Sequence, residues 1–246
     1  MSDFRYTRPD SFPPIVKNLI IINALVFLAQ VVLTNVNFTE WIQLYPIMPE
    51  QLHDILVQSK HPLYRNGQRF EPYQIATHMF AHSPTMIFHI LFNMFALWMF
   101  GRILENVWGP KRFLLFYIAC GVGAALAHLA IQYFRCEQLL QAILTDSPEV
   151  GNLLGAVAPA VGASGAVMGI FAAFAYLFPN TELYIMFIPV PVKAKWAVLG
   201  LAAIDLFGGV ANFSGDNVAH FAHLGGALTG FILVLIWNKT SRKRFY

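Results

Sequence analysis

Long apolar stretches separated by short polar segments are the main pattern along this chain. A membrane-spanning helix needs about 20 mostly apolar residues. Six stretches approach that length, and they cover residues 16–33, 86–104, 113–134, 160–178, 194–207 and 218–237. The fifth is the shortest, because Pro189 and Pro191 interrupt the apolar residues just before it. The pattern predicts an all-α polytopic membrane protein whose six transmembrane helices form a bundle.

The segments outside these stretches complete the predicted organisation. Residues 1–15 form a short N-terminal segment, residues 16–237 one membrane domain and residues 238–246 a basic tail. The connection 34–85 is too long for a turn, so we expect it to fold as an ordered cap at one membrane face. The connection 136–158 carries several acidic residues and is expected to be a solvated loop.

Composition supports the membrane class and excludes others. Of the 246 residues, 57% are hydrophobic and only 12% are charged, whereas soluble domains carry about 25% charged residues. The net charge of +3 is too small to indicate nucleic-acid binding. Two cysteines, Cys120 and Cys136, cannot form the disulfide framework of a small secreted domain.

The basic residues predict the orientation of the bundle. If the N-terminus is cytoplasmic and the chain crosses six times, twelve of the 16 Lys and Arg residues lie on the cytoplasmic side. This distribution follows the positive-inside rule, and the opposite orientation would invert it. We therefore expect both termini in the cytoplasm.

Four polar side chains are expected at one depth inside the bilayer. In the predicted topology, spans two, four and six run in the same direction from the outer face. His89 and Asn93 lie in the first turns of span two, and Ser164 and His223 each lie about five residues into spans four and six. Polar groups inside a membrane are costly and usually functional.

Glycines favour contact between spans four and six, because small residues let helix backbones approach closely in lipid. The relevant glycines are Gly162, Gly165, Gly169, Gly226 and Gly230. Close approach would bring the Ser164 hydroxyl to the His223 imidazole, which could act as its general base. Backbone N–H groups near Ser164, together with His89 and Asn93, could stabilise an oxyanion. Asp205 is the single acid within a predicted span, near its outer end, and is expected to anchor a helix end, so the pattern predicts a Ser-His dyad.

Three segments carry a resemblance to a known family. They are HILFN at 89–93, GASGAVMG at 162–169 and AHLGGALTG at 222–230. Their order and spacing resemble the rhomboid family of intramembrane serine proteases, and the likeness covers residues 70–237. The resemblance implies a six-helix core that cleaves other membrane proteins in or near their transmembrane segments and uses no cofactor.

The resemblance also implies a role for each matching residue. Ser164 would be the nucleophile and His223 the general base. His89 and Asn93 would support the oxyanion, with Gly162 beside the nucleophile. The implied partners are transmembrane substrates and the lipid bilayer, the range of the family suggests a bacterial plasma membrane, and the oligomeric state is not specified.

Two positions depart from the family pattern. FEPY at 70–73 stands where many members carry a Trp-Arg pair, and Met168 stands where some members have an aromatic ring against the catalytic His. We therefore expect the base to be oriented differently here. His220, one turn before His223, is an alternative base, although the Leu-Gly-Gly run that follows His223 favours His223.

Other functional classes remain as alternatives. His78 and His82 have a zinc-ligand spacing, but Met79 stands where the H-E-x-x-H motif requires Glu, so no metal is expected. An intramembrane aspartyl protease would require two acids in spans, and Asp205 has no counterpart. A non-enzymatic protein, either a transporter or a membrane-protein-binding scaffold, is the remaining alternative, although no internal repeat is visible.

Overall fold

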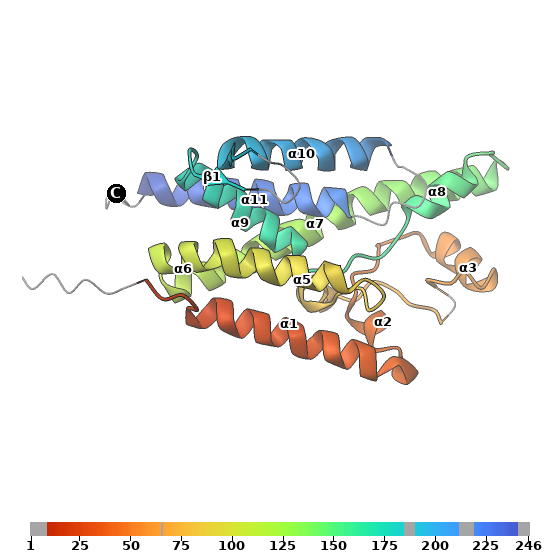
Figure 1. The fold of residues 1–246 in the computed structure, drawn as a ribbon. Coiled ribbons are helices and arrows are strands. Elements are labelled where there is room, and N and C mark those ends of the chain that lie inside the picture. Colours follow the sequence, from red (N-terminus) through yellow and green to blue (C-terminus); the bar gives the residue numbers. More distant parts are fainter. Residues whose placement is uncertain (1–8, 65, 185–189, 212–218, 241–246) are drawn as a thin grey trace, which may run out of the picture.

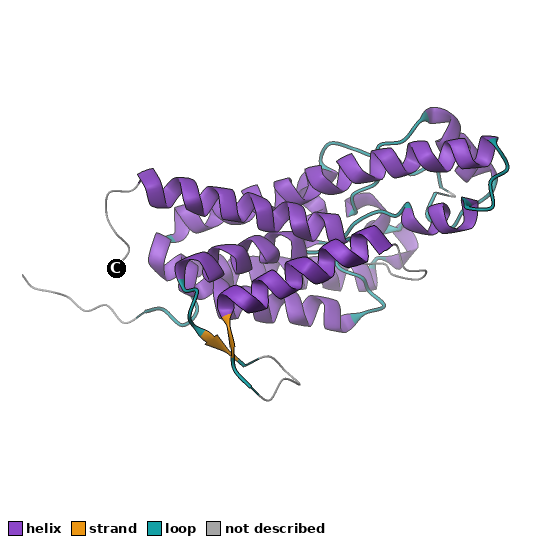
Figure 2. Cartoon of the chain, turned by 90° about the horizontal axis from the view of Figure 1, so that it is seen from above, coloured by secondary structure: helices purple, strands orange, loops and turns teal. Residues whose placement is uncertain are grey.

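The computed structural model describes residues 9–64, 66–184, 190–211 and 219–240, and the described chain is mostly helical (Figure 1). The helices of the bundle are α1 (Pro14–Val32), the continuous run of α5 (Ile87–Ala96), η3 (Leu97–Gly101) and α6 (Arg102–Trp108), then α7 (Pro110–Leu144), α9 (Ser164–Leu177), α10 (Ala194–Ala211) and α11 (His220–Thr240). The short elements are η1 (Thr34–Val36), α2 (Phe38–Ile42), α3 (Glu50–Gln58), α4 (Gln74–Thr77), η2 (His78–Phe80), α8 (Val150–Ala156), β1 (Glu182–Leu183) and β2 (Val192–Lys193). The two strands pair antiparallel, just before α10 begins (Figure 2).

The predicted all-α polytopic class is confirmed. Among the described residues, five helices are long and apolar enough to cross a membrane: α1, the continuous helix formed by α5, η3 and α6, then α7, α10 and α11. The helices lie roughly side by side, and α1 begins at the end of the bundle where α11 ends (Figure 1). Apolar side chains on the outside of the bundle, such as Phe88 on α5 and Phe207 on α10, are more than half exposed and form a surface suited to lipid.

The fourth predicted span differs from its expected boundaries. Helix α9 has 14 residues, which is about 21 Å of rise and less than the roughly 30 Å hydrocarbon thickness. It begins at Ser164 and not directly after Pro159, because Ala160 forms an extended backbone pair with Leu44 in the loop before α3. None of the side chains of α9 is exposed, since α7, α10, α11 and η3 surround it. A helix enclosed by protein in this way does not need to span the lipid alone.

Glycines set the contact between α9 and α11, as the sequence predicted. A methyl group at Gly226 would overlap the carbonyl oxygen of Gly165, and one at Gly230 would lie 2.6 Å from the carbonyl oxygen of Gly169. The two backbones therefore touch over two helical turns. This direct approach holds the start of α9 beside the start of α11.

The cap is ordered, and the segment that follows span three belongs to it. Buried side chains from α3 and its flanking loops, including Tyr45 and Tyr64, pack against Cys136, Leu139 and Leu140. The expectation of a solvated loop at 136–158 is therefore wrong. Helix α7 continues to Leu144 and α8 follows it, because the extended helix has an apolar face that the cap covers.

Candidate active site

The backbone before α9 brings Ser164 to the first position of a helix. Gly162 has a φ of 127°, a conformation that residues with a Cβ rarely adopt, and its N–H donates to the carbonyl oxygen of His78 over 2.9 Å. The chain then turns at Ala163 and enters α9. Ser164 is thus not about five residues into its helix, as expected, but at its N-terminus. The N–H groups of a first helical turn have no partner within the helix and favour negative charge.

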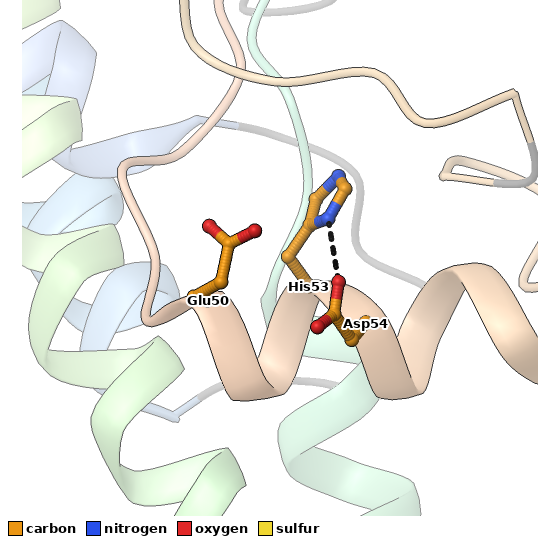
Figure 3. Close-up of side chains that lie close together, drawn as sticks. All are labelled: Glu50, His53 and Asp54. Atoms are coloured by element: carbon orange, nitrogen blue, oxygen red, sulfur yellow. Dashed lines mark ion pairs between the residues drawn. The ribbon is translucent and has the colours of Figure 1, made fainter.

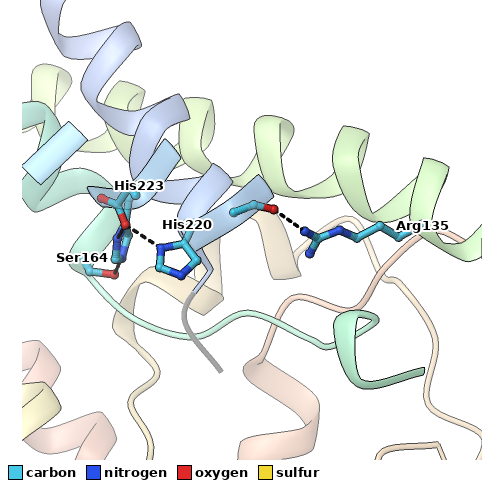
Figure 4. Close-up of polar contacts among 6 residues, drawn as sticks. Arg135, Ser164, His220 and His223 are labelled. Atoms are coloured by element: carbon cyan, nitrogen blue, oxygen red, sulfur yellow. Dashed lines mark hydrogen bonds and ion pairs between the residues drawn. The ribbon is translucent and has the colours of Figure 1, made fainter. Parts of the chain in front are cut away.

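Ser164 and His223 meet across the α9–α11 contact. The Oγ of Ser164 lies 2.8 Å from Nε2 of His223, and the two side chains face each other (Figure 4). His223 is the fourth residue of α11, on the part of that helix that the glycines bring close to α9. The proximity expected from matched depth is therefore observed, although the two residues are 59 positions apart in the chain.

A carboxylate lies on the other side of the His223 ring. The Oδ1 atom of Asp205, on α10, is 3.0 Å from Nδ1 of His223 and 2.8 Å from Nδ1 of His220. The sequence predicts a Ser-His pair with no acid beside it, and the contact of Asp205 with His223 adds to that prediction. With Nδ1–H donated to Asp205, the Nε2 atom of His223 carries the lone pair that can accept from the Ser164 hydroxyl.

The structure also separates the two candidate bases. His223 makes the contact with Ser164, whereas His220 donates to Asp205 and packs over Gly208, where a methyl group would lie 2.5 Å from its ring. Sequence reasoning identified Asp205 but did not place it beside His223. The signal was its depth, because it lies near the outer end of its span, where the other polar groups are also expected.

His89 and Gly162 lie next to Ser164. A methyl group at Gly162 would be 2.9 Å from Nε2 of His89 and 3.4 Å from Oγ of Ser164, so these three residues surround one small space. Asn93 is one turn from His89 on the same face of α5. It is buried, and within the described chain its Nδ2 atom has no hydrogen-bond partner. A buried donor without a partner is unusual, and Asn93 carries one a single helical turn from His89.

The histidines of the cap make backbone contacts. Nδ1 of His78 is 3.0 Å from the carbonyl oxygen of Gln74, and Nδ1 of His82 lies 3.3 Å from that of Phe80. The ring of His82 also packs edge-on against His89, with centroids 5.1 Å apart. Burial lowers the pKa of His78 and of His82 to about 4 in each case, so both are neutral at pH 7.

A separate group of potential metal ligands lies on α3. The side chains of Glu50, His53 and Asp54 offer ligand atoms within 4.8 Å of one another (Figure 3). Both carboxylate oxygens of Glu50, however, accept hydrogen bonds from Arg69 over 2.7 Å. These hydrogen bonds lower the pKa of Glu50. The Arg69 guanidinium group therefore already balances the charge of the Glu50 carboxylate, as a metal ion would.

Comparison with known proteins identifies the family. Residues 69–239 match the model of the Rhomboid domain. The chain belongs to the rhomboid family. The resemblance stated from the three sequence segments is thereby confirmed, and the matched range contains every residue of the site described above.

Several curated relatives share about 30% of their residues with this chain. Rhomboid protein 1, mitochondrial, of Saccharomyces cerevisiae is 30% identical over 164 residues, which are 67% of this chain and 42% of that protein. Presenilin-associated rhomboid-like protein, mitochondrial, of Homo sapiens is 31% identical over 163 residues (63% and 37%). RHOMBOID-like protein 12, mitochondrial, of Arabidopsis thaliana is 31% identical over 176 residues (70% and 47%). The chain thus spans less than half the length of these relatives, and their mitochondrial names conflict with the expectation of a bacterial plasma membrane.

Proposed function

We propose that this rhomboid-family protein is an intramembrane serine endopeptidase that hydrolyses peptide bonds in or near transmembrane segments of other membrane proteins. The observation that carries the proposal is the 2.8 Å contact between Ser164 Oγ and His223 Nε2. A hydroxyl and an imidazole at this distance have the geometry of a nucleophile and its general base. Family membership and the apolar surface of the bundle support a membrane-embedded substrate.

In the proposed acylation step, Ser164 Oγ attacks the carbonyl carbon of the scissile bond. Its proton passes to Nε2 of His223, and a tetrahedral oxyanion forms. When the C–N bond breaks, the same Nε2 returns the proton to the leaving amine, and an acyl ester remains on Ser164. The chemistry uses side chains and substrate alone, so it requires no cofactor.

The oxyanion has donors on two sides in this proposal. The first-turn N–H groups of α9 approach from the Ser164 side. From α5, His89 lies beside Gly162, and Asn93 one turn further along carries an unpaired Nδ2 donor that would assist it. Gly162 keeps the space between them open. Water then attacks the ester with His223 again as base, which releases the carboxylic acid and restores Ser164.

The experiment compares variants of the purified protein on a model substrate with one transmembrane helix, in detergent and in vesicles. Ser164→Ala and His223→Ala are each expected to lower cleavage by about 10³-fold or more while the protein still folds. The control is Ser59→Ala, which removes an exposed hydroxyl at the end of α3. Cleavage at the wild-type rate by Ser164→Ala would refute the proposal.

A serine-directed fluorophosphonate separates the enzyme from the non-enzymatic alternative. The probe bonds covalently to a hydroxyl only when a base activates it. We expect labelling of the wild type and of Ser59→Ala, and none of Ser164→Ala or His223→Ala. A transporter or scaffold would show no labelling that depends on His223.

A further inference from the structure

One carboxylate oxygen of Asp205 joins α10 to α11, and His223 extends this connection to α9. It lies on α10 with only 7% of its surface exposed, and its Oδ1 accepts from Nδ1 of His220 and from Nδ1 of His223 on α11. Through His223 it is linked to Ser164 on α9. A carboxylate in a membrane span is costly unless charge or hydrogen bonds compensate it. The presence of Asp205 at this position therefore suggests a function.

We propose that Asp205 is a positioning residue that fixes the His223 imidazole, in orientation and tautomer, for proton transfer from Ser164. The inference rests on the proposed serine protease function and deepens it, because it extends the predicted Ser-His pair to a Ser164–His223–Asp205 relay. His220 supports the relay as a second donor that holds the carboxylate in place.

The tautomer is the first consequence of this contact. A neutral imidazole carries one proton, which can reside on either nitrogen. Asp205 accepts a hydrogen bond from the Nδ1–H group of His223. The proton is therefore on Nδ1, and Nε2 is unprotonated, 2.8 Å from the Ser164 hydroxyl. Without the carboxylate, the ring could carry its proton on Nε2, and it could then accept nothing from Ser164.

The charge balance of the reaction is the second consequence. When Ser164 passes its proton to Nε2, the imidazole becomes a cation with both nitrogens protonated. The Asp205 carboxylate remains ionised 3.0 Å from Nδ1 and stabilises that cation until Nε2 releases the proton to the leaving amine. No proton moves to Asp205 in this cycle.

The surroundings hold the carboxylate in one place. The ring of His220 lies over Gly208, which has no Cβ to obstruct it. One helical turn beyond Asp205, the Arg135 guanidinium on α7 donates to the carbonyl oxygen of Gly209 over 2.9 Å (Figure 4). The end of α10 that carries Asp205 is therefore fixed to both α7 and α11.

If Asp205 only anchored the end of α10, it would make the same contacts. The test must therefore distinguish anchoring from positioning of His223. Asp205→Asn keeps the size of the side chain but can present an N–H group to Nδ1 of His223, which favours the wrong tautomer. We expect kcat to fall by about 10²–10⁴-fold with KM within about twofold of the wild type. His220→Ala retains the direct bond to His223 and should lower kcat much less.

Glu105→Gln is the matched control, because Glu105 is a second buried carboxylate with a structural contact. It accepts from the backbone N–H groups of Ile15 and Val16 at the start of α1, over 2.9 and 2.8 Å. This variant should lower the melting temperature without changing kcat. If Asp205→Asn behaves as Glu105→Gln does, with lower stability and unchanged kcat, the positioning role is wrong.

A second variant tests the inference if Asp205→Asn folds poorly. Asp205→Ala leaves space for a small carboxylate, and added formate should restore part of its kcat but none of the activity of Ser164→Ala. A folded Asp205→Ala with wild-type kcat, or one that formate does not stimulate, would overturn the inference. If instead Ser164→Ala cleaves normally, the proposed function itself fails, so the two failures are distinguishable.

Discussion

Gly226 of α11 lies directly against the carbonyl oxygen of Gly165 on α9. This backbone contact is one residue from Ser164 and three residues from His223, so it sets how closely the hydroxyl and the imidazole approach. The geometry of the site is thus decided by two residues without side chains.

Replacing Gly226 tests this relationship. In Gly226→Ala the new methyl group would overlap the Gly165 carbonyl, so the helices must separate. We expect a loss of about 1–3 kcal/mol in the free energy of unfolding and a fall in kcat, measured by thermal unfolding and by cleavage of the model substrate. Gly200→Ala on α10 is the control, because a Cβ there meets nothing within 4 Å. Equal behaviour of the two variants would contradict the role of the contact.

Gly162→Ala is expected to close the space beside the nucleophile. Its methyl group would lie 2.9 Å from His89 and 3.4 Å from Ser164, and its positive φ is strained for any residue with a Cβ. Fluorophosphonate labelling and cleavage should both fall. Gly155→Ala, in α8 with open space around its Cβ, should retain both. Full labelling of Gly162→Ala would show that the space is not the reaction site.

Asn93→Ala should separate activity from stability. Its Nδ2 donor is buried without a partner in the described chain, so its removal relieves an unsatisfied group and should not lower the melting temperature. If the donor stabilises the oxyanion, kcat falls by about 10²–10³-fold. A stable variant with unchanged kcat would remove Asn93 from the oxyanion site.

Acid should weaken the cap through His78 and His82. Burial lowers the pKa of each to about 4, below the ordinary histidine pKa of about 6.5, so the folded state binds protons more weakly than the unfolded chain does. Their stabilisation is complete above about pH 6.5 and decreases as the pH falls toward 4, by up to about 1.4 kcal/mol per pH unit for each. Thermal unfolding between pH 7.5 and 5 should show the decline.

The control for this pH effect removes the titrating groups. In the double variant His78→Gln and His82→Gln, the melting temperature should depend less steeply on pH over the same range. A wild-type melting temperature that stays constant from pH 7.5 to 5 would contradict the assignment.

Some features of the fold and the site could be predicted from local sequence. Apolar runs of spanning length predict helices, because a backbone in lipid must satisfy its hydrogen bonds within the segment. Glycines at helical spacing predicted the α9–α11 contact, and matched depth predicted that Ser164 and His223 would meet. The spacing of Cys136, Leu139 and Leu140 is also helical, and it is a local signal for the continuation of α7 to Leu144.

Other features depend on partners far away in the chain. Helix α9 begins at Ser164 because Ala160 pairs with Leu44, and no local pattern around Ser164 specifies that pairing. Asp205 lies at the right depth by sequence, but the rotation of α10 decides whether its carboxylate faces lipid, solvent or His223. The sequence by itself determined the membrane class and the proximity of Ser164 and His223, since lipid and helix geometry act locally. Only the packing of α10 against α11 decided that one carboxylate oxygen would accept from both histidines.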